Sequence, residues 1–467
     1  MTSQRCDAKM VKEGRVLNKL TDFKDTSMIE REYYLQQLIS KQGNGLVKVI
    51  TGPRRAGKSY LLFVIFKQYL QSKGIRDDQI IEVALDRVSQ MALRNPYELE
   101  KYIKACIGAE KGKHYVFIDE IQLSVKVKNP LLDEAVIALE DRELAYITFY
   151  DVLNDLLGNP DLEIFVTGSN SRMLSKDIAT NFRGRSCEIR VFPLSFSEFL
   201  SFSGSDKHDA WIQYMTYGGM PQVVLEEDVY AKSRYLSDLM KNVYQKDIVE
   251  RHKLKNDYVL ENLVKILFSS IGSLTNPHKL VHTLASVLNI KTTDETIKAL
   301  LGYLEDAFIF QKAERFDVKG KSYLSSPFKY YAIDVGLRNA FLGFRQQEKT
   351  HLMENIIYNE LLLRGYSVDV GVVVLNKRIE GKLKQGQHEI DFIVNTGFQK
   401  IYIQSAFSVE DSRKKQNEIL PLQETGDYFR KIVVTDGNQE AWSDDEGIVY
   451  IGVIPFLLNK SFLNKEV

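Results

Sequence analysis

The amino-acid sequence predicts an α/β fold, with a parallel sheet covered by helices, over residues 1–230, because strand-like and helix-like segments alternate there. A glycine-containing loop follows the first predicted strand and leads into an apolar, helix-like segment. A later apolar strand ends in two adjacent carboxylates. Ligands bind outside the carboxyl ends of strands in open sheets of this kind, so both features are expected at one edge. Strands are predicted at residues 46–50, 80–85, 115–118, 163–167 and 188–192, and helices at 60–73, 96–109, 129–157 and 171–179.

The loop at residues 52–59 reads Gly-Pro-Arg-Arg-Ala-Gly-Lys-Ser, the pattern of a phosphate-binding loop. Gly52 and Gly57 let the backbone wrap around a polyphosphate, so that successive N–H groups point inward. Lys58 is expected to reach the β- and γ-phosphates, and the Ser59 hydroxyl to bind Mg²⁺. The alternative is a glycine turn that merely precedes a lysine, but the flanking strand and helix favour a nucleotide. The residues predicted to bind it are Gly52, Pro53, Arg54, Arg55, Ala56, Gly57, Lys58, Ser59 and Tyr60.

Asp119 and Glu120 are the two carboxylates that end the strand at 115–118. Asp119 is expected to hold Mg²⁺, and Glu120 to polarise the water that attacks the γ-phosphate. An apolar strand that ends in Asp-Glu is by itself often only a solvated strand end. Sixty residues after a phosphate loop, the catalytic interpretation is favoured.

Polar residues also end the strand at 163–167, where Thr167, Ser169 and Asn170 are candidates to bind the γ-phosphate or the water. The sequence does not separate the three, and each could instead cap the helix predicted at 171–179. Arg183 and Arg185 follow that helix, and a guanidinium offers planar, paired donors to phosphate oxygens. One of them is a candidate arginine finger, with a turn of two solvated arginines as the alternative. A finger that acts in trans would require an oligomer of this chain.

The overall composition excludes several classes of protein. The chain has 467 residues with 62 Lys+Arg and 62 Asp+Glu, so it carries no global basic field that would by itself imply nucleic acid. Its three cysteines fall in no metal-ligand spacing, which is typical of reduced thiols in a cytosolic protein. The start lacks the apolar core of a signal peptide, and no apolar run is long enough for a membrane span. A cytoplasmic protein of two to four domains is expected.

A second region, residues 231–345, has helical apolar spacing at 260–271, 277–288 and 293–304, followed by two strand-like segments, which together predict a winged-helix-like module. Its third helix is acidic, which opposes the approach of phosphate groups. A structural role or a contact with protein is therefore favoured over reading of a DNA sequence. Basic residues cluster elsewhere in this region, at Lys241, Lys246, Arg251, Lys253 and Lys255.

The motifs together resemble a known family. After the phosphate loop and the Asp-Glu strand come Thr-Gly-Ser-Asn at 167–170, Arg-Gly-Arg at 183–185, Pro-Leu-Ser-Phe at 193–196 and Gly-Gly-Met-Pro at 218–221. In this order they resemble the prokaryotic AAA+ ATPases that are fused to a C-terminal domain of unknown function. The resemblance implies a five-stranded AAA+ core, ATP with Mg²⁺ as ligands, and ATP hydrolysis. It divides the chain into an ATP-binding domain (1–230), the winged-helix-like module (231–345) and a C-terminal domain (346–467).

The C-terminal domain resembles the restriction-endonuclease-like fold, whose site needs a helix acid, a strand acid and Glu-x-Lys on the next strand. Glu354 and Asp391 fit the first two positions, but Gln404 and Ala406 stand where the Glu and Lys are needed. Loss of a charged metal ligand and of the cation should prevent this domain from hydrolysing nucleic acid. An inactive nuclease-like domain is expected.

The leading hypothesis is therefore a AAA+ switch or motor that hydrolyses ATP with Mg²⁺ and acts on an unidentified protein or DNA partner. The alternatives are an ATP-gated nucleic-acid enzyme and a DNA-binding regulator, both of which would use the C-terminal half.

Overall fold

The computed structural model describes residues 29–108, 112–133, 135–169, 182, 184–254, 257–345, 348–379, 382–397, 399–407 and 412–464. Residues 31–467 form one compact unit. Along the part of the chain that is described, no helix is both long and apolar enough to cross a membrane.

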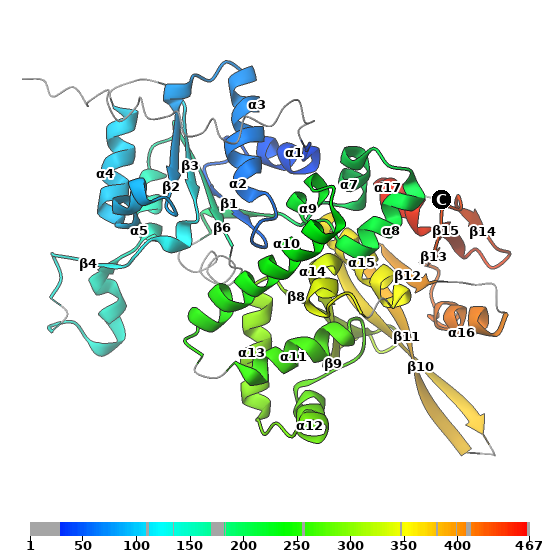
Figure 1. Cartoon of the computed structure of the whole chain (residues 1–467). Helices are drawn as coiled ribbons and strands as arrows, with labels where there is room; N and C mark the ends of the chain where they lie inside the picture. Colours follow the sequence, from blue (N-terminus) through cyan, green and yellow to red (C-terminus); the bar gives the residue numbers. More distant parts are fainter. Residues whose placement is uncertain are drawn as a thin grey trace, which may run out of the picture. The chain divides into compact units, whose positions relative to one another are not determined.

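The first sheet has five parallel strands in the order β2-β3-β6-β1-β7 (Figure 1). This confirms the predicted α/β core. The central strands β1, β3 and β6 are buried along their whole length, as expected for a parallel sheet covered on both faces. The strands are β1 (Val47–Thr51), β2 (Ile80–Ala84), β3 (His114–Asp119), β6 (Leu162–Gly168) and β7 (Ser186–Arg190).

Two layers of helices cover this sheet. Apolar side chains of α1 and of the segment α2–η2–α3 pack on one face, and those of α4 and α5 pack on the other. The α2 helix begins directly after the phosphate loop, so its N-terminus faces the loop. The bounds are α1 (Glu32–Ser40), α2 (Lys58–Tyr60), the π-helical η2 (Leu61–Phe66), α3 (Lys67–Ser72), η3 (Asp77–Gln79), η4 (Val88–Arg94), α4 (Pro96–Ile107) and α5 (Phe149–Leu156).

The helix predicted over 129–157 is wrong except for its last part, α5. The preceding segment forms an arm, residues 124–148, whose two short strands pair at its base: β4 (Val127–Lys128) with β5 (Tyr146–Ile147). Leu131, Val136, Leu139 and Leu144 in the arm are exposed rather than packed on a core, and packing of an apolar face supplies most helical stability in proteins. The short helical turns η5 (Ile121–Leu123) and η6 (Leu139–Ala145) flank β4 and β5.

A helical region follows the first sheet. Its last three helices match the three predicted from apolar spacing, and α12 and α13 begin at side-chain caps, Asn276 and Thr293. The helices are α7 (Phe196–Ser203), α8 (Lys207–Tyr217), α9 (Pro221–Leu225), α10 (Val229–Asn242), the π-helical η7 (Val243–Glu250), α11 (Tyr258–Ser269), α12 (Pro277–Leu288) and α13 (Asp294–Asp306).

The second sheet has eight strands in the order β14-β15-β13-β12-β11-β10-β8-β9. The strands are β8 (Phe310–Asp317), β9 (Ser322–Ala332), β10 (Ser367–Ile379), β11 (Lys382–Asn395), β12 (Lys400–Ala406), β13 (Arg430–Thr435), β14 (Trp442–Ser443) and β15 (Val449–Gly452). The helices are α14 (Val335–Phe341), α15 (Lys349–Leu363), α16 (Ser412–Gln423), α17 (Val453–Leu458) and η8 (Phe462–Asn464).

The two strands predicted as the ribbon of a separate winged helix, β8 and β9, belong to this second sheet, because β8 pairs in parallel with β10. One apolar core also runs from Phe192 to Leu463. Half of β9 is buried, and an isolated ribbon could not cover it. Residues 231–345 and 346–467 therefore share a sheet and a core.

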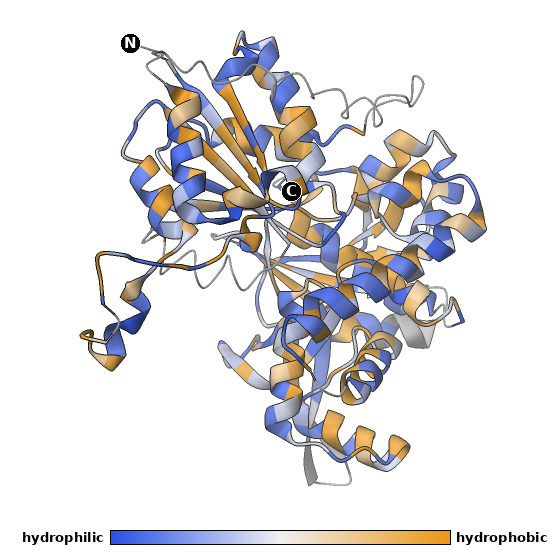
Figure 2. Ribbon diagram, turned by 60° about the vertical axis from the view of Figure 1, so that its left-hand side comes forward, coloured by the Kyte–Doolittle hydropathy of each residue, from blue (hydrophilic) through white to orange (hydrophobic). Residues whose placement is uncertain are grey.

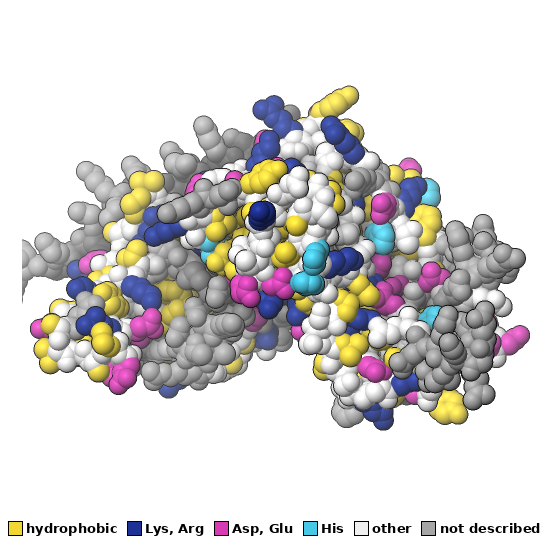
Figure 3. All heavy atoms as spheres, turned by 90° about the horizontal axis from the view of Figure 1, so that it is seen from below, with side chains coloured by type: hydrophobic (Ala, Val, Ile, Leu, Met, Phe, Trp, Pro, Cys, Tyr) yellow, Lys and Arg dark blue, Asp and Glu magenta, His cyan; other side chains and the backbone are white. Residues whose placement is uncertain are grey.

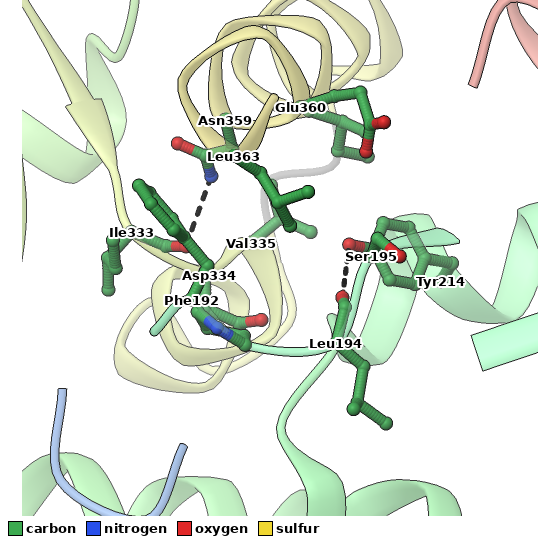
Figure 4. A pocket seen from close by; sticks show the side chains of 12 residues that line it. Phe192, Leu194, Ser195, Tyr214, Ile333, Asp334, Val335, Asn359, Glu360 and Leu363 are labelled. Carbon is green, nitrogen blue, oxygen red and sulfur yellow. Dashed lines mark hydrogen bonds between the residues drawn. The ribbon is translucent and has the colours of Figure 1, made fainter. Parts of the chain in front are cut away.

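The Pro-Leu-Ser-Phe and Gly-Gly-Met-Pro segments meet at a tight joint with α14. The Leu194 N–H donates to Gly219 O at 2.7 Å, and the Gly219 N–H donates to the Asp334 carboxylate at 2.7 Å. A Cβ on Gly218 would lie 2.2 Å from Asp334, so only glycine fits there. A cavity of about 20 Å³ adjoins this joint, and it has room for about one water molecule (Figure 4).

Asp334 yields a prediction of pH dependence. Burial raises the pKa of Asp334 to about 6, although N–H groups of Gly219, Leu337 and Gly336 oppose the rise. The folded protein therefore holds this proton more tightly than the unfolded chain. This contribution to stability is fully present below pH 3.8 and is lost as pH rises through about 6. The Asp334→Asn variant should lack this pH-dependent contribution to stability, because asparagine does not titrate. We expect the wild-type free energy of unfolding, relative to the variant's, to fall by about 3 kcal/mol over this range.

Urea unfolding of both proteins from pH 3.5 to pH 7 measures this difference. Equal slopes for the two proteins would contradict the raised pKa.

Candidate nucleotide site

The phosphate loop, residues 52–57, lies between β1 and α2 in a conformation that its glycines permit. Gly52 has φ +141° and approaches β7 so closely that a Cβ would lie 2.1 Å from Val191 O. Gly57 has φ +91°, and Arg55 between them has φ +67°. Alternation of ordinary and left-handed residues turns successive backbone N–H groups to one side, which makes an anion-binding concavity. The loop therefore suits the phosphates of a nucleotide.

Lys58 is folded back over this loop. Its ammonium donates to Gly52 O at 3.0 Å and to Pro53 O at 2.9 Å, and the side chain is buried. Burial lowers the pKa of Lys58, while the Glu120 and Asp119 carboxylates oppose that change. An ammonium held by two neutral carbonyl groups can exchange them for charged phosphate oxygens, which are stronger partners.

The Asp119 carboxylate binds both neighbouring elements of the site. The Ser59 hydroxyl, at the start of α2, donates to Asp119 Oδ1 at 2.9 Å, and the Thr167 hydroxyl on β6 donates to the same oxygen. Burial raises the pKa of Asp119 above its ordinary value, and the Thr167 hydrogen bond works against the rise. Hydroxyl and carboxylate oxygens are the ligands that Mg²⁺ prefers, so Ser59 and Asp119 fit the predicted metal role.

Glu120 is held in place by side chains from two elements. Its φ is +54°, a left-handed conformation that costs energy in a residue with a Cβ, and its N–H donates to Thr167 Oγ1 at 3.1 Å. The Gln122 amide and the Ser169 hydroxyl, at 3.3 Å, both donate to Glu120 Oε2. The Glu120 charge also raises the pKa of Arg54 on the loop, after the larger effect of Asp247. The carboxylate therefore lies within electrostatic reach of the phosphate loop.

Three residues that matter here were not predicted from the sequence: Gln122, Arg31 and Asp247. Arg31 is buried at the start of α1 and donates to Ala56 O in the loop at 3.0 Å, to Phe192 O at 2.8 Å and to Glu198 at 2.9 Å. Asp247 lies on η7, and Arg54 of the loop binds it through two nitrogens at 2.9 and 2.7 Å. No local motif identifies Arg31 or Asp247, because they lie 25 and 193 positions from the loop residues they bind.

The other predicted residues divide into three groups. Pro53 and Ala56 are buried in the loop, and Tyr60 is partly exposed on α2. Arg185 is exposed at the turn before β7. Asn170 and Arg183 lie outside the described residues, so their predicted roles stay predictions.

The C-terminal sheet gathers a second group of ionisable side chains. It brings together Glu354 on α15 and Asp391 on β11, as predicted, with Gln404 of β12 beside them. The Gln404 amide donates to Glu418 at 2.7 Å, and its carbonyl oxygen accepts from the Asp391 N–H at 3.2 Å. In the described part of the chain, no group of three or more His, Cys, Asp or Glu side chains is arranged to hold a metal ion.

A cation that the sequence did not indicate stands among these acids. Lys329 of β9 is buried, and its ammonium lies 2.9 Å from Glu354, 2.5 Å from Glu389 and 3.5 Å from Asp391. Burial alone would lower the pKa of Lys329, but the three carboxylates raise it. Lys329 in turn lowers the pKa of Glu354 to about 2 against the effect of burial. Burial and the Glu354 charge raise the pKa of Asp391. The lysine thus supplies one compensating positive charge to a cluster of three carboxylates.

Lys329→Met should therefore destabilise the chain strongly, because it leaves buried carboxylates without their cation. Removal of one partner from a buried ion pair typically costs about 3–5 kcal/mol. Denaturant unfolding measures the loss. Lys329→Met combined with Glu354→Gln should recover part of it, since one orphaned charge is gone. A single variant as stable as the wild type would show that the cluster needs no internal cation.

Comparisons with known proteins agree with this geometry. Residues 44–200 match the family described as AAA domain, and residues 208–348 match a domain of unknown function, DUF8612. An uncharacterized protein of Haemophilus influenzae is 32% identical over 437 residues, which covers 92% of this chain and 99% of the relative. An uncharacterized protein of Methanocaldococcus jannaschii is 26% identical, covering 97% of this chain and 96% of the relative.

Two solved structures are more distantly similar. A Walker-type ATPase of Pyrococcus abyssi is 15% identical with a TM-score of 0.46, covering 68% of this chain and 96% of that chain. The Orc1 protein of Aeropyrum pernix, solved in complex with DNA, is 11% identical with a TM-score of 0.30, covering 69% and 95%. The full-length match to the Haemophilus protein places the sequence plainly: the chain belongs to one family with that relative, and its residues 44–200 match the AAA domain family.

Proposed function

We propose that this chain binds ATP with Mg²⁺ at residues 52–60, hydrolyses it with Glu120, and uses the cycle as a switch acting on a macromolecular partner through residues 231–467. The observation that carries the proposal is the Asp119 carboxylate, which binds Ser59 of the phosphate loop and Thr167 of β6 in one buried cluster. An ordinary strand end would not need two hydroxyl donors on one carboxylate oxygen.

The phosphates are received by the loop backbone and Lys58. When phosphate oxygens arrive, the Lys58 ammonium leaves Gly52 O and Pro53 O for these charged acceptors. The Ser59 hydroxyl and the Asp119 carboxylate would hold Mg²⁺, while Thr167 would keep Asp119 in position through its hydrogen bond. When bound, Mg²⁺ neutralises charge on the β- and γ-phosphates.

Glu120 is the proposed general base. Its carboxylate accepts a proton from the attacking water, while Gln122 and Ser169 fix one of its oxygens and leave the other for the water. Ser169 is therefore a positioning residue in this proposal, and so is Gln122. Arg183 or Arg185 is retained as the candidate for binding the γ-phosphate.

The switch proceeds through Arg54. This loop arginine binds both carboxylate oxygens of Asp247 on η7 through its Nε and Nη2 atoms, so the phosphate loop and the helical region are connected directly. A γ-phosphate in the loop competes with Asp247 for the same guanidinium. Binding and hydrolysis of ATP thus change the partner of Arg54, and with it the support of η7.

Lys58→Ala and Glu120→Gln separate binding from chemistry. Lys58→Ala should weaken ATP binding at least about tenfold, because it removes the buried cation that meets the phosphates. Glu120→Gln should bind ATP as the wild type does and lose at least about a hundredfold in kcat, since an amide cannot accept the proton. Calorimetric titration with ATP and a steady-state phosphate-release assay measure the two effects. Unchanged affinity in the first variant, or near-normal turnover in the second, would refute the assignment.

Asp247→Asn tests the switch. The substitution preserves the side-chain shape but removes the charge that competes for Arg54, so ATP should bind as tightly as before or tighter. Hydrogen exchange of residues 229–254 should change when ATP binds to the wild type and respond less in the variant. Asp238→Asn is the matched control, because Asp238 is exposed on α10 and contacts no loop residue among those described. An equal exchange response in all three proteins would contradict the coupling through Arg54.

A further inference from the structure

The arm between η5 and α5 exposes several large apolar side chains that the described part of a single chain does not bury. Leu131, Val136, Leu139 and Leu144 are 88%, 83%, 79% and 65% exposed. Single exposed apolar residues are ordinary, but a concentration of them on one projecting segment marks an interaction site. We propose that the arm of one copy of this chain docks on the η7 surface of a second copy, where the η7 surface is defined by Lys241, Lys246, Lys253 and Tyr258.

The arm is anchored at its base and free at its tip. The β4–β5 pair closes the base, together with a hydrogen bond from the Asn129 N–H to Ala145 O at 2.7 Å. The Val125 N–H donates to Arg94 O at 2.9 Å, which fixes the base to the core. The tip stands clear of the sheet and of its helices, and apolar segments alternate there with polar ones (Figures 1 and 2).

The tip is also strongly acidic. Residues 131–144 contain five Asp or Glu residues and one Arg. In the described part of this segment, Asp133, Glu140, Asp141 and Glu143 are all exposed. Figure 3 shows charged and apolar side chains mixed over the arm, at the left of the view. The occupant of this surface should therefore combine positive charge with exposed apolar area.

The chain itself offers such a surface. Residues 229–255 contain seven Lys or Arg residues against three Asp or Glu, and one of the three, Asp247, is buried against Arg54. Lys241, Lys246 and Lys253 are exposed, and Tyr258, the first residue of α11, is 53% exposed. Although the whole chain is neutral, acidic residues are concentrated at the arm tip and basic residues in residues 229–255, so opposite charges are segregated. That segregation is what a head-to-tail contact between copies requires.

A protein occupant fits the η7 surface better than a nucleic acid does. Asp238 and Glu250 are exposed among the lysines, and Asp238 pairs with Arg234 at 3.9 Å. Such interleaved acids oppose a phosphate backbone. The arm, which carries Arg142 among its acids, presents matching mixed charges.

The proposed contact would join two nucleotide sites. The arm begins immediately after η5, which contains Gln122, the residue bound to Glu120. The η7 surface includes Lys246, which precedes Asp247 in η7, and Asp247 binds Arg54 of the phosphate loop. A partner seated across both elements is therefore positioned to connect the water-activating side of one site with the phosphate loop of another.

Charge reversal tests the pairing. An arm variant (Glu140→Lys, Asp141→Lys, Glu143→Lys) and an η7 variant (Lys241→Glu, Lys246→Glu, Lys253→Glu) are compared with the full-length wild type by sedimentation velocity from 1 to 100 µM, at low and high salt. We expect the wild type to associate and each variant alone to associate at least about tenfold more weakly, because like charges meet. An equimolar mixture of the two variants should associate again, since both of its arm–η7 pairs are complementary. Substitution of Leu131, Val136 and Leu139 by Ser should also weaken association, and mixing this variant with the η7 variant should not restore it.

The ATP affinity of every variant is measured as a check of its fold and should equal that of the wild type. Because neither ATP affinity nor association requires hydrolysis, the test of association does not depend on the proposed ATPase activity. A wild type that stays monomeric throughout the concentration range would overturn the proposal, as would variants that associate normally or a mixture that fails to recover. Fluorescence anisotropy with a 30-bp DNA duplex tests whether the η7 surface binds nucleic acid instead of the arm. DNA binding that the η7 variant loses, together with a monomeric wild type, would assign the surface to nucleic acid instead.

Discussion

The Asp119 carboxylate is the constraint on which the nucleotide site depends. It ends β3, and it accepts hydroxyl hydrogen bonds from the first turn of α2 and from β6, so it connects three elements that meet only at the sheet edge. Because Asp119 and Thr167 are buried, the two hydrogen bonds form with little competition from water and cost much to leave unmade. The parallel order that places β3 next to β6, and β6 next to β1, makes this geometry available. An antiparallel neighbour would bring the opposite end of a strand to this edge.

The sequence was sufficient for this part of the molecule because its information is local. A phosphate loop, two carboxylates at a strand end and a polar strand tip each occupy a few consecutive residues, and the parallel sheet brings their ends to one edge. The residues that support the loop could not be predicted, because the information that identifies them is not local. Arg31 and Asp247 contact the loop from distant parts of the chain, and a buried arginine or aspartate has no local pattern that distinguishes it from a solvated one. The unpredicted Gln122 is close in sequence, but its role depends on the left-handed turn at Glu120.

The C-terminal half shows how a local comparison can miss a residue that the fold supplies. Sequence reasoning found no cation at Ala406 on β12, and the structure places Lys329 of β9 among Glu354, Glu389 and Asp391. That position could not be predicted, because β8 and β9 were assigned to a separate ribbon rather than to the eight-stranded sheet. With its ammonium bound to three carboxylates, Lys329 balances charge that would otherwise need a metal ion or protons. The cluster is accounted for as a stabilising ion-pair network, and the nuclease-like and winged-helix descriptions of this half stay predictions.

The same dependence on distant residues bears on how the site can be controlled. A phosphate loop needs only backbone N–H groups, one lysine and one hydroxyl to bind its ligand, so Arg54 need not be bound to another part of the protein for binding to occur. Here two of its three nitrogens, Nε and Nη2, bind Asp247, on a helix outside the matched AAA domain, and Arg31 joins the loop to the segment that follows β7. Each interaction lets the helical region influence the conformation of the loop, and linkage requires that the ligand of the loop influence the helical region equally. Under the proposed function, ATP and a partner of the helical region would therefore affect each other through Arg54, because the loop and η7 share a charged hydrogen-bonded pair.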